Sequence, residues 1–353
     1  MPLLRVGLAG YGRIAERVHF DLIRNLPRAK LVAVAETDPA RREEMRRRAP
    51  GIEVLDDTGE LLRSKNVDAV VVALPNALHA QTAIAAIGQS KHVYLEKPLA
   101  VGLEEARQVM EASRSAGTTC MIGFNYRFHP LYIEARRRLR AGGLGALVAV
   151  RTAFSSAARD LPAWKQSRSQ GGGALLDLGS HHLDLMRFLL EREIEEVSAF
   201  TMSGRGEQET AVMQMRLTGG LPAQSFFSLG AVDEDRVEIY GAAGKLTIDR
   251  YRSWSIDITP PRAPHRRLAP LKSVTGRALD AMRGPLWKQR LAAPGREPSF
   301  GAALEAFVAA VLGEDVEYPG FIDGYRSLKA IHAAEVSSDL GRAVRIHEDS
   351  AGE

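Results

Sequence analysis

Apolar runs alternate with amphipathic stretches along the first 122 residues. Six runs have the composition of β-strands, at 3–9, 30–36, 51–54, 68–74, 91–95 and 118–122. Apolar positions recur at helical spacing between them, near 13–25, 39–48, 57–64, 78–88 and 102–116. The run at 69–74 does not alternate with polar residues, as expected for a strand covered on both faces. This pattern predicts βαβ units that form a doubly wound parallel sheet.

The pattern changes after about residue 123. A helix is predicted at 130–141, a strand at 146–156 and an apolar helix at 174–190. Six further strand-like runs follow, separated by glycine-rich turns, at 196–203, 210–218, 221–229, 235–241, 244–249 and 253–258. Two helices, near 299–313 and 323–340, close the chain. The prediction is an α/β domain at 1–122 and an α+β domain at 123–353, whose open sheet is largely antiparallel or mixed.

A glycine turn directly after the first predicted strand is the strongest functional signal. The sequence Gly10-x-Gly12-x-x-Ala15 then runs into a predicted helix. The first glycine allows a tight turn, the second lets backbone N–H groups approach a diphosphate, and the alanine lets helix and strand pack closely. The helix N-terminus adds unpaired N–H donors and a partial positive charge. We therefore expect this turn, including Arg13 and Ile14, to bind a dinucleotide.

Glu36 ends the second predicted strand, 24 residues beyond Gly12. An acid at about this offset of ~20 residues accepts hydrogen bonds from the adenosine ribose of NAD and repels the 2′-phosphate of NADP. Arg41 and Arg42 follow closely and could accommodate that phosphate, so NAD is favoured and NADP is less so. The alternative is a solvated charge at a strand end.

Two motifs follow the fourth and fifth predicted strands, at the edge where open α/β sheets bind ligands. In Pro75-Asn76-x-x-His79, the asparagine could line the cofactor site or cap the next helix, and the histidine has a structural alternative. In Glu96-Lys97-Pro98, the lysine is placed to meet a substrate oxygen beside the nicotinamide. Its alternative is an ordinary surface lysine. We expect Glu96 and Lys97 to contact the cofactor as well.

A second cluster lies in the predicted helix 174–190. Asp177, His181 and Asp184 share one face by their spacing, whereas His182 points about 100° away. A histidine oriented by a carboxylate is a suitable general base near neutral pH. The alternatives are a metal site and a helix histidine with a purely structural hydrogen bond. We expect no metal, because the sequence offers no complementary cluster of ligands.

Further substrate contacts are expected where the two domains meet and in the loop before the glycines. Tyr126 and Arg127 follow the last strand of the first domain, and Trp164 and Lys165 are weaker candidates. Clefts commonly form at such crossings.

Composition bears on disulfide formation, membrane insertion, localisation and charge. One cysteine, Cys120, excludes an intrachain disulfide, and no apolar run approaches the ~20 residues that cross a bilayer. The first strand begins within three residues, which leaves no room for a signal peptide, so a cytoplasmic protein is expected. The net charge is +4, but nine Lys or Arg and one acid lie between Arg262 and Arg296. The basicity therefore belongs to a Pro- and Arg-rich insert at 259–298 and does not indicate nucleic-acid binding.

These motifs together resemble the Gfo/Idh/MocA oxidoreductases, named for glucose-fructose oxidoreductase and inositol dehydrogenase. The resemblance covers about 1–250 and the C-terminal helices. It implies a Rossmann domain, a second domain with an open sheet through which the chains form homodimers or homotetramers, and hydride transfer between NAD(P) and a sugar or cyclitol hydroxyl carbon. It also implies that His181 is the acid/base and that Lys97 and Asp177 assist it. The family often has Asp at the position of Glu36, and the 259–298 insert has no counterpart that can be placed.

Three functions remain open at this point. The leading hypothesis is an NAD-dependent dehydrogenase of sugars, cyclitols or their derivatives. A glycoside hydrolase or lyase that uses held NAD for a transient oxidation would need nearly the same residues. A non-catalytic NAD-binding regulator would need only the nucleotide site. The basic insert is expected to be a surface or interface segment, with a lid that attracts an anionic substrate as the alternative.

Overall fold

The computed structural model describes residues 3–262, 286 and 297–347. Its contacts divide the chain into two compact units. The first contains Met1–Asn125, Ser169–Gly171 and Ser299–Leu328, and the second contains Tyr126–Arg168, Gly172–Pro298 and Lys329–Glu353. The segment Ser299–Leu328, which the sequence-based division places in the C-terminal domain, thus groups with the N-terminal unit. Most of the predicted 259–298 insert lies outside the described residues.

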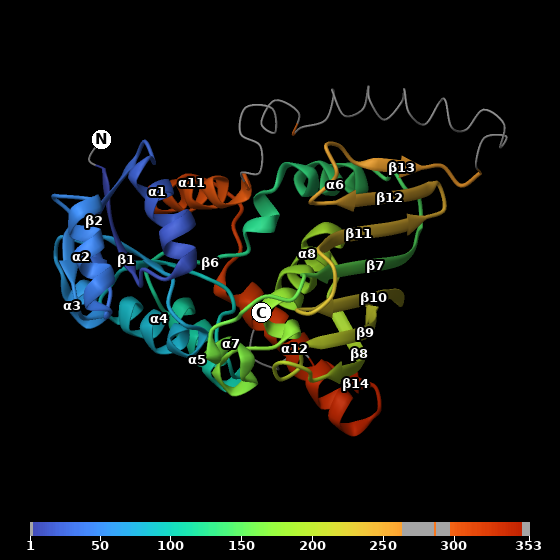
Figure 1. Ribbon diagram of the computed structural model, residues 1–353. Helices are drawn as coiled ribbons and strands as arrows, with labels where there is room; N and C mark the ends of the chain where they lie inside the picture. The colour runs from blue at the N-terminus through green and yellow to red at the C-terminus, as the bar shows by residue number, and fades with distance from the viewer. Residues whose placement is uncertain (1–2, 263–285, 287–296, 348–353) are drawn as a thin grey trace. The chain divides into compact units, whose positions relative to one another are not determined.

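A parallel sheet of six strands forms the centre of the first unit (Figure 1). Its strands are β1 (Leu4–Ala9), β2 (Ala29–Ala35), β3 (Glu53–Leu55), β4 (Ala69–Val72), β5 (His92–Leu95) and β6 (Cys120–Ile122). They are ordered β3-β2-β1-β4-β5-β6, which is the doubly wound dinucleotide-binding order with its topological switch between β1 and β4. All four residues of β4 are buried, as expected from an apolar run that has helices on both of its sides.

Helices connect these strands. They are a π turn (Ala15–His19) that continues as α1 (Phe20–Arg24), then α2 (Pro39–Arg48), α3 (Thr58–Arg63), α4 (His79–Gly88) and α5 (Leu103–Arg114). A short 3₁₀ turn, Asn76–Leu78, precedes α4, and another, Asn125–Phe128, follows β6. The helices predicted near 39–48 and 57–64 are present as α2 and α3, and Asp38 and Asp57 accept hydrogen bonds from their first backbone N–H groups.

The segment Ser299–Leu328 completes the first unit. Its helix α11 (Ser299–Val311) packs against α1 and β5, and the ring of Phe307 lies 5.7 Å from that of Tyr94. The backbone N–H of Ile122 donates to the carbonyl of Pro319 at 3.0 Å, which lengthens the hydrogen-bonding edge of the sheet. Apolar burial and an edge contact therefore bring a distant segment to this sheet, which no local sequence pattern signals.

The second unit contains a mixed sheet of eight strands. They are β7 (Leu147–Ser155), β8 (Ile194–Met202), β9 (Thr210–Leu217), β10 (Leu221–Ser228), β11 (Glu234–Gly241), β12 (Gly244–Asp249), β13 (Asp257–Thr259) and β14 (Val344–Arg345). The order is β13-β12-β11-β7-β10-β9-β8-β14, with β7 and β10 parallel and the other neighbouring strands antiparallel. The predicted fold class is confirmed. The strand predicted at 253–258 is shorter than expected, because Ser253 and Asp249 bond to each other in a turn.

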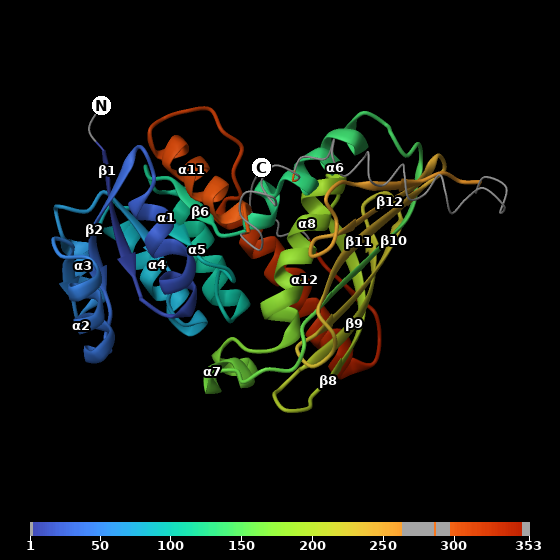
Figure 2. The same ribbon diagram turned by 45° about the horizontal axis from the view of Figure 1, so that its top comes forward.

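Helices cover one face of this sheet (Figure 2). They include α6 (Pro130–Arg140) and a π turn (Leu175–Gly179) that continues as α8 (Ser180–Leu190). Short turns, α7 (Ala163–Gln166) and Arg168–Gln170, precede the glycines, and α12 (Phe321–Leu340) begins in the first unit and continues in the second. Gly179 lets the helix approach the sheet, since a Cβ there would lie 3.3 Å from the ring of Phe227.

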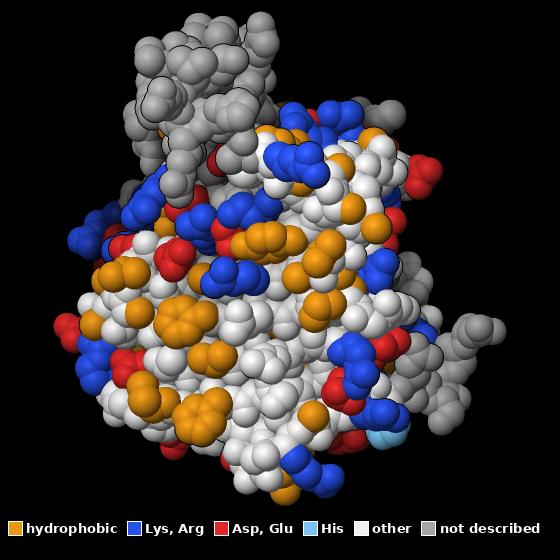
Figure 3. Space-filling model, turned by 90° about the vertical axis from the view of Figure 1, so that its right-hand side faces the viewer, with side chains coloured by type: hydrophobic (Ala, Val, Ile, Leu, Met, Phe, Trp, Pro, Cys, Tyr) orange, Lys and Arg blue, Asp and Glu red, His pale blue; other side chains and the backbone are white. Residues whose placement is uncertain are grey.

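The other face of the sheet carries exposed apolar side chains. We call Phe200, Met202, Val212 and Phe226 the open sheet face. Phe200 pairs with Val212, which pairs with Phe226, so three of them form one row across β8, β9 and β10. Phe200 is 73% exposed and Met202 is 56% exposed. Figure 3 shows hydrophobic side chains spread over this side of the molecule. Within the described residues, no helix is long and apolar enough to cross a membrane.

Candidate functional site

The glycine turn of the first unit has the geometry that its sequence requires. Gly10 has a φ of +90°, and a Cβ at this position would lie 2.7 Å from the carbonyl oxygen of Ala73. Nothing lies within 4 Å of a Cβ placed on Gly12, so the space over the turn is open. Ala15 is fully buried and starts the π turn, while Arg13 is exposed and Ile14 half-buried. The turn can therefore admit a ligand against its backbone at Gly12.

Glu36 lies at the end of β2, beside the glycine turn. Its Oε2 accepts a hydrogen bond from the backbone N–H of Tyr11 at 2.8 Å, and its Oε1 from that of Asp38 at 2.9 Å. Only 9% of Glu36 is exposed, so the alternative of a solvated charge is wrong. Arg42 donates to the carbonyls of Glu36 and Thr37, at 2.9 and 2.6 Å. A carboxylate fixed in this way can accept ribose hydroxyls with its remaining lone pairs.

The motif after β4 is anchored by two side chains. Asn76 lies in the 3₁₀ turn and Leu78 is the N-cap residue of α4, so the alternative that Asn76 caps this helix is wrong. Asn76 Nδ2 instead donates to the carbonyl of Gly171 at 2.8 Å. His79 is buried, with Nδ1 2.6 Å from the carbonyl oxygen of Pro98 and Nε2 3.0 Å from that of Leu74. Burial lowers the pKa of His79. This imidazole therefore joins the end of β4 to the turn that carries Lys97.

Glu96 supports the same turn from the other side. Its Oε1 lies 2.6 Å from Nε2 of His19, and both side chains are buried. His19 ends the π turn that begins at Ala15, so this pair connects the glycine-turn helix to the Glu96-Lys97-Pro98 turn. Lys97 itself is half-buried, and the bond to Pro98 is cis. The sequence reasoning missed His19, since a single histidine within an amphipathic helix carries no signal of its partner.

In the second unit, the π turn and α8 carry Asp177 and His181. Lys165 Nζ lies 2.9 Å from Asp177 Oδ2. The imidazole of His181 is half-buried and stacks on the ring of Tyr126, with 4.5 Å between centroids and 18° between planes. The phenol of Tyr126 donates to the buried carboxylate of Asp235 at 2.8 Å. A half-buried imidazole held by a stacked ring can exchange a proton with a bound ligand.

Other predicted residues have partners within the same unit. Arg127 binds Asp184 with two hydrogen bonds, the one from Nε to Oδ2 at 2.8 Å, and Arg187 lies 3.7 Å from the same carboxylate. Asp184 is thus committed to two guanidinium groups. Trp164 is half-buried on α7, and the ammonium of Lys165 lies 5.5 Å from its ring centre.

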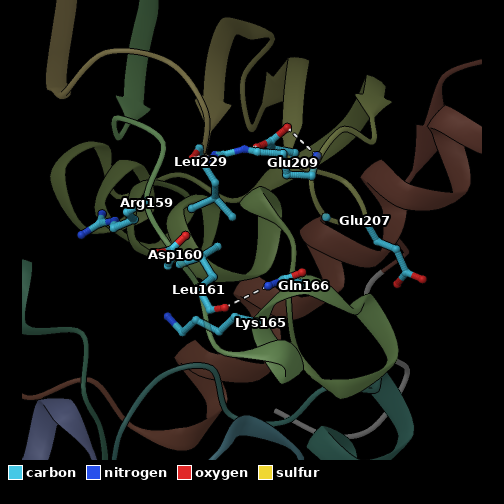
Figure 4. Close-up of a pocket in the computed structure, with 10 residues that line it drawn as sticks. Arg159, Asp160, Leu161, Lys165, Gln166, Glu207, Glu209 and Leu229 are labelled. Carbon is cyan, nitrogen blue, oxygen red and sulfur yellow. Dashed lines mark hydrogen bonds and ion pairs between the residues drawn. The ribbon is translucent and has the colours of Figure 1, made fainter.

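A cavity of about 100 Å³ lies within the second unit (Figure 4). Three cations and three carboxylates contribute to its wall, with polar and apolar groups between them: Arg159, Asp160, Leu161, Lys165, Gln166, Arg205, Gly206, Glu207, Glu209 and Leu229. Because Lys165 both lines this cavity and pairs with Asp177, it connects the cavity to the Asp177–His181 motif. Such a mixed lining suits a ligand with many hydroxyl groups. Among the described residues, no group of three or more His, Cys, Asp or Glu could hold a metal ion.

Comparison with known families agrees with this geometry. Residues 4–124 match the oxidoreductase family with an NAD-binding Rossmann fold, and residues 132–247 match the GFO/IDH/MocA C-terminal domain. The chain belongs to the GFO/IDH/MocA family. The resemblance found from the motifs is therefore confirmed, and the chain is an NAD-binding oxidoreductase of a family of inositol and sugar dehydrogenases.

Individual relatives extend the comparison. The chain is 28% identical to the myo-inositol 2-dehydrogenase of Thermotoga maritima over 273 residues, which covers 72% of this chain and 78% of that protein. It is 30% identical to the scyllo-inositol 2-dehydrogenase (NAD(+)) of Bacillus subtilis over 265 residues, covering 72% and 76%. The crystal structure of an oxidoreductase domain protein from Kribbella flavida superposes with a TM-score of 0.84 at 25% identity, covering 99% and 100%.

Two alanine substitutions in the glycine turn should separate folding from cofactor binding. Gly10→Ala places a methyl group against the Ala73 carbonyl at a positive φ, so we expect the free energy of unfolding to fall by about 1–3 kcal/mol. Gly12→Ala meets no protein atom and should unfold like the parent, yet bind NADH about tenfold more weakly, because the methyl group blocks the approach of the diphosphate. Thermal unfolding and NADH fluorescence titration measure the two effects. Unchanged NADH affinity in Gly12→Ala would place the diphosphate elsewhere.

Proposed function

We propose that the protein is an NAD-dependent dehydrogenase that oxidises a hydroxyl carbon of a sugar, a cyclitol or a related derivative. The observation that carries the proposal is the half-buried His181, stacked on Tyr126 and following Asp177 on one helix, in a chain related to inositol dehydrogenases. An imidazole with partial access to solvent suits proton transfer, whereas a fully buried one would not.

The residues would divide the chemistry between them. His181 takes the proton of the substrate hydroxyl, and Asp177 supports it with negative charge. The ammonium of Lys97 stabilises the developing alkoxide. Nicotinamide, when bound, would supply the acceptor for the hydride of the same carbon, which balances the oxidation of the alcohol to a carbonyl. Tyr126, Arg127 and Trp164 remain predicted substrate contacts.

Glu36 would set the preference for NAD over NADP. A buried carboxylate that accepts two backbone N–H groups lies beside the glycine turn, where it would repel a 2′-phosphate. Arg41 lies at the limit of ion-pair distance from it, 4.0 Å, and Arg42 is engaged with carbonyls. Gly10, Gly12, Arg13, Ile14 and Ala15 would surround the diphosphate. Pro75, Asn76, His79 and Glu96 would shape the nicotinamide end, with the histidine acting through the backbone that it holds.

The substrate would be a small polyhydroxylated molecule. Two of the relatives described above are named for acting on inositols. The mixed-charge cavity beside Lys165 offers both donors and acceptors, which neutral hydroxyl groups can use at once. We also propose a homodimer or homotetramer assembled through the open sheet face, since an apolar patch of this exposure is typical of a protein interface.

A screen of NAD reduction tests the reaction. The purified chain should reduce NAD with at least one member of a panel of cyclitols, aldoses, glucosides and nucleotide sugars, followed by absorbance at the NADH band, and should do so faster than with NADP. Cleavage of a glycoside with no net NADH would instead support the hydrolase or lyase. NADH binding without any turnover would support the regulator.

Lys97→Met should lower kcat by about 10²–10⁴-fold, because the charge that stabilises the alkoxide is lost. NADH affinity should stay close to that of the parent protein. Lys30→Met is a suitable control, since Lys30 is exposed on β2 and should be neutral. Steady-state kinetics and NADH titration give both quantities. Parental turnover in Lys97→Met would remove this lysine from the mechanism.

Phe200→Glu should weaken the assembly. A charge in the apolar row cannot be buried against a second copy without a partner, so the oligomer should dissociate at micromolar concentration. Leu340→Glu changes another exposed apolar residue, 54% exposed at the end of α12, and should leave the assembly intact. Sedimentation velocity measures the mass of each species. A monomeric parent would rule out this interface.

A further inference from the structure

A buried polar cluster in the second unit is centred on Asp235, near the start of β11. This residue is completely buried, and its carboxylate accepts four side-chain hydrogen bonds. Oδ2 accepts from the hydroxyl of Tyr126 at 2.8 Å and from Nε of Arg250 at 2.7 Å. Oδ1 accepts from the hydroxyl of Tyr132 at 3.3 Å and from Nε2 of His182 at 3.1 Å. The motif histidine that faces away from His181 therefore belongs to this cluster.

The carboxylate of Asp235 in this cluster is ionised. Burial by itself would raise the pKa of Asp235, but the Arg250 guanidinium and the His182 hydrogen bond keep it well below its usual range. Asp235 is therefore an anion at neutral pH, and an ionised carboxylate only accepts, so Nε2 of His182 carries the proton. Arg250 also pairs with Glu297. Buried ion pairs add little to stability compared with apolar packing, so the role of this one lies in the groups that it fixes in place.

The cluster fixes the ring of Tyr126, on which the imidazole of the proposed acid/base His181 stacks. Tyr126 is only 5% exposed, and its hydroxyl end is fixed on Asp235 while its ring lies parallel to His181 at 4.5 Å. The Arg250 guanidinium lies 4.7 Å from the centre of the same ring. With the phenol fixed at both its oxygen and its ring, the imidazole cannot rotate without losing the stacked contact.

We infer that Asp235 is a positioning residue that acts through Tyr126 to fix the plane of the His181 imidazole. The inference rests on the proposed role of His181. If the hydroxyl of Tyr126 loses its acceptor, the ring can tilt, and the imidazole then samples orientations that are unproductive for proton transfer. Small errors of orientation at a reacting group can cost up to ~10²-fold in rate.

The chain offers a matched control. Tyr126 and Tyr132 each donate one buried phenol to Asp235, to different oxygens. Tyr126 stacks on His181, while the ring of Tyr132 lies 5.8 Å from that of Tyr126 and 5.4 Å from that of His129. Replacing either by Phe removes the same group from the same carboxylate. Only the first replacement frees the ring that holds the imidazole.

The test uses the full chain labelled with ¹³C at the histidine ring carbons, with the His181 signal assigned by His181→Asn. In the parent and in Tyr132→Phe we expect one sharp Cε1–H signal for His181. In Tyr126→Phe it should broaden or split, although both variants lose a similar amount of thermal stability. Asp235→Asn should give the same broadening and supplies a second test if Tyr126→Phe folds poorly.

Kinetics with NAD and myo-inositol, or the polyol that the screen selects, complete the experiment. Tyr126→Phe should lower kcat by about 10–100-fold with little change in KM, and Tyr132→Phe should leave both near parental values. An unchanged His181 signal in Tyr126→Phe, or equal effects of the two variants, would overturn the inference. Absence of turnover in the parent would count against the proposed function, while the NMR comparison would still decide the positioning role.

Discussion

A carboxylate that is buried away from water needs hydrogen-bond donors or a counter-charge, and both units of the protein contain buried carboxylates that meet this requirement. Glu36 is held by the backbone N–H of Tyr11 in the glycine turn, so the same contact that satisfies the acid also fixes the turn. Glu96 is held by His19, and Asp235 by an arginine, a histidine and two phenols. In each case, satisfying a buried acid determines where a segment of the candidate site lies.

The helix after the glycine motif and the helix after Asp177 share a second feature. A π turn opens each of them, at Ala15–His19 after the glycine motif and at Leu175–Gly179 around Asp177. Such wide turns are rare and are frequently found at functional sites. Here the buried side chains of Ala15, Leu175 and Leu176 provide the packing that lets a less regular turn persist. The first turn delivers His19 to Glu96, and the second places Asp177 where Lys165 can reach it.

Local sequence patterns predicted those helices and strands that depend on residues close together along the chain. The helix expected at 39–48 is present with those bounds, because an N-cap aspartate and an N1 proline fix its start. The parallel first sheet and the mixed second sheet were also predicted, from apolar runs and the turn residues between them, whereas the order of the strands comes from the structure. Contacts between distant residues were not predictable. Asn76 and Gly171 are 95 positions apart, and nothing near Asp235 marks it as the acceptor of Tyr126, 109 positions away. Such partners are chosen by packing, which a single sequence does not reveal.

Asp177, on the π turn before α8, and Asp184, on α8, were both expected on the same helix face as His181, but their surroundings differ. The side chain of Asp184 is 1% exposed, and its charge is balanced within the unit by Arg127 and Arg187. The side chain of Asp177 is 18% exposed, and its partner Lys165 also lines the cavity. An ion pair with access to solvent can exchange one partner for a ligand at low cost, whereas a fully buried pair cannot do so without leaving an unpaired charge. Asp177, rather than Asp184, is therefore the carboxylate of this helix that is able to respond to a substrate.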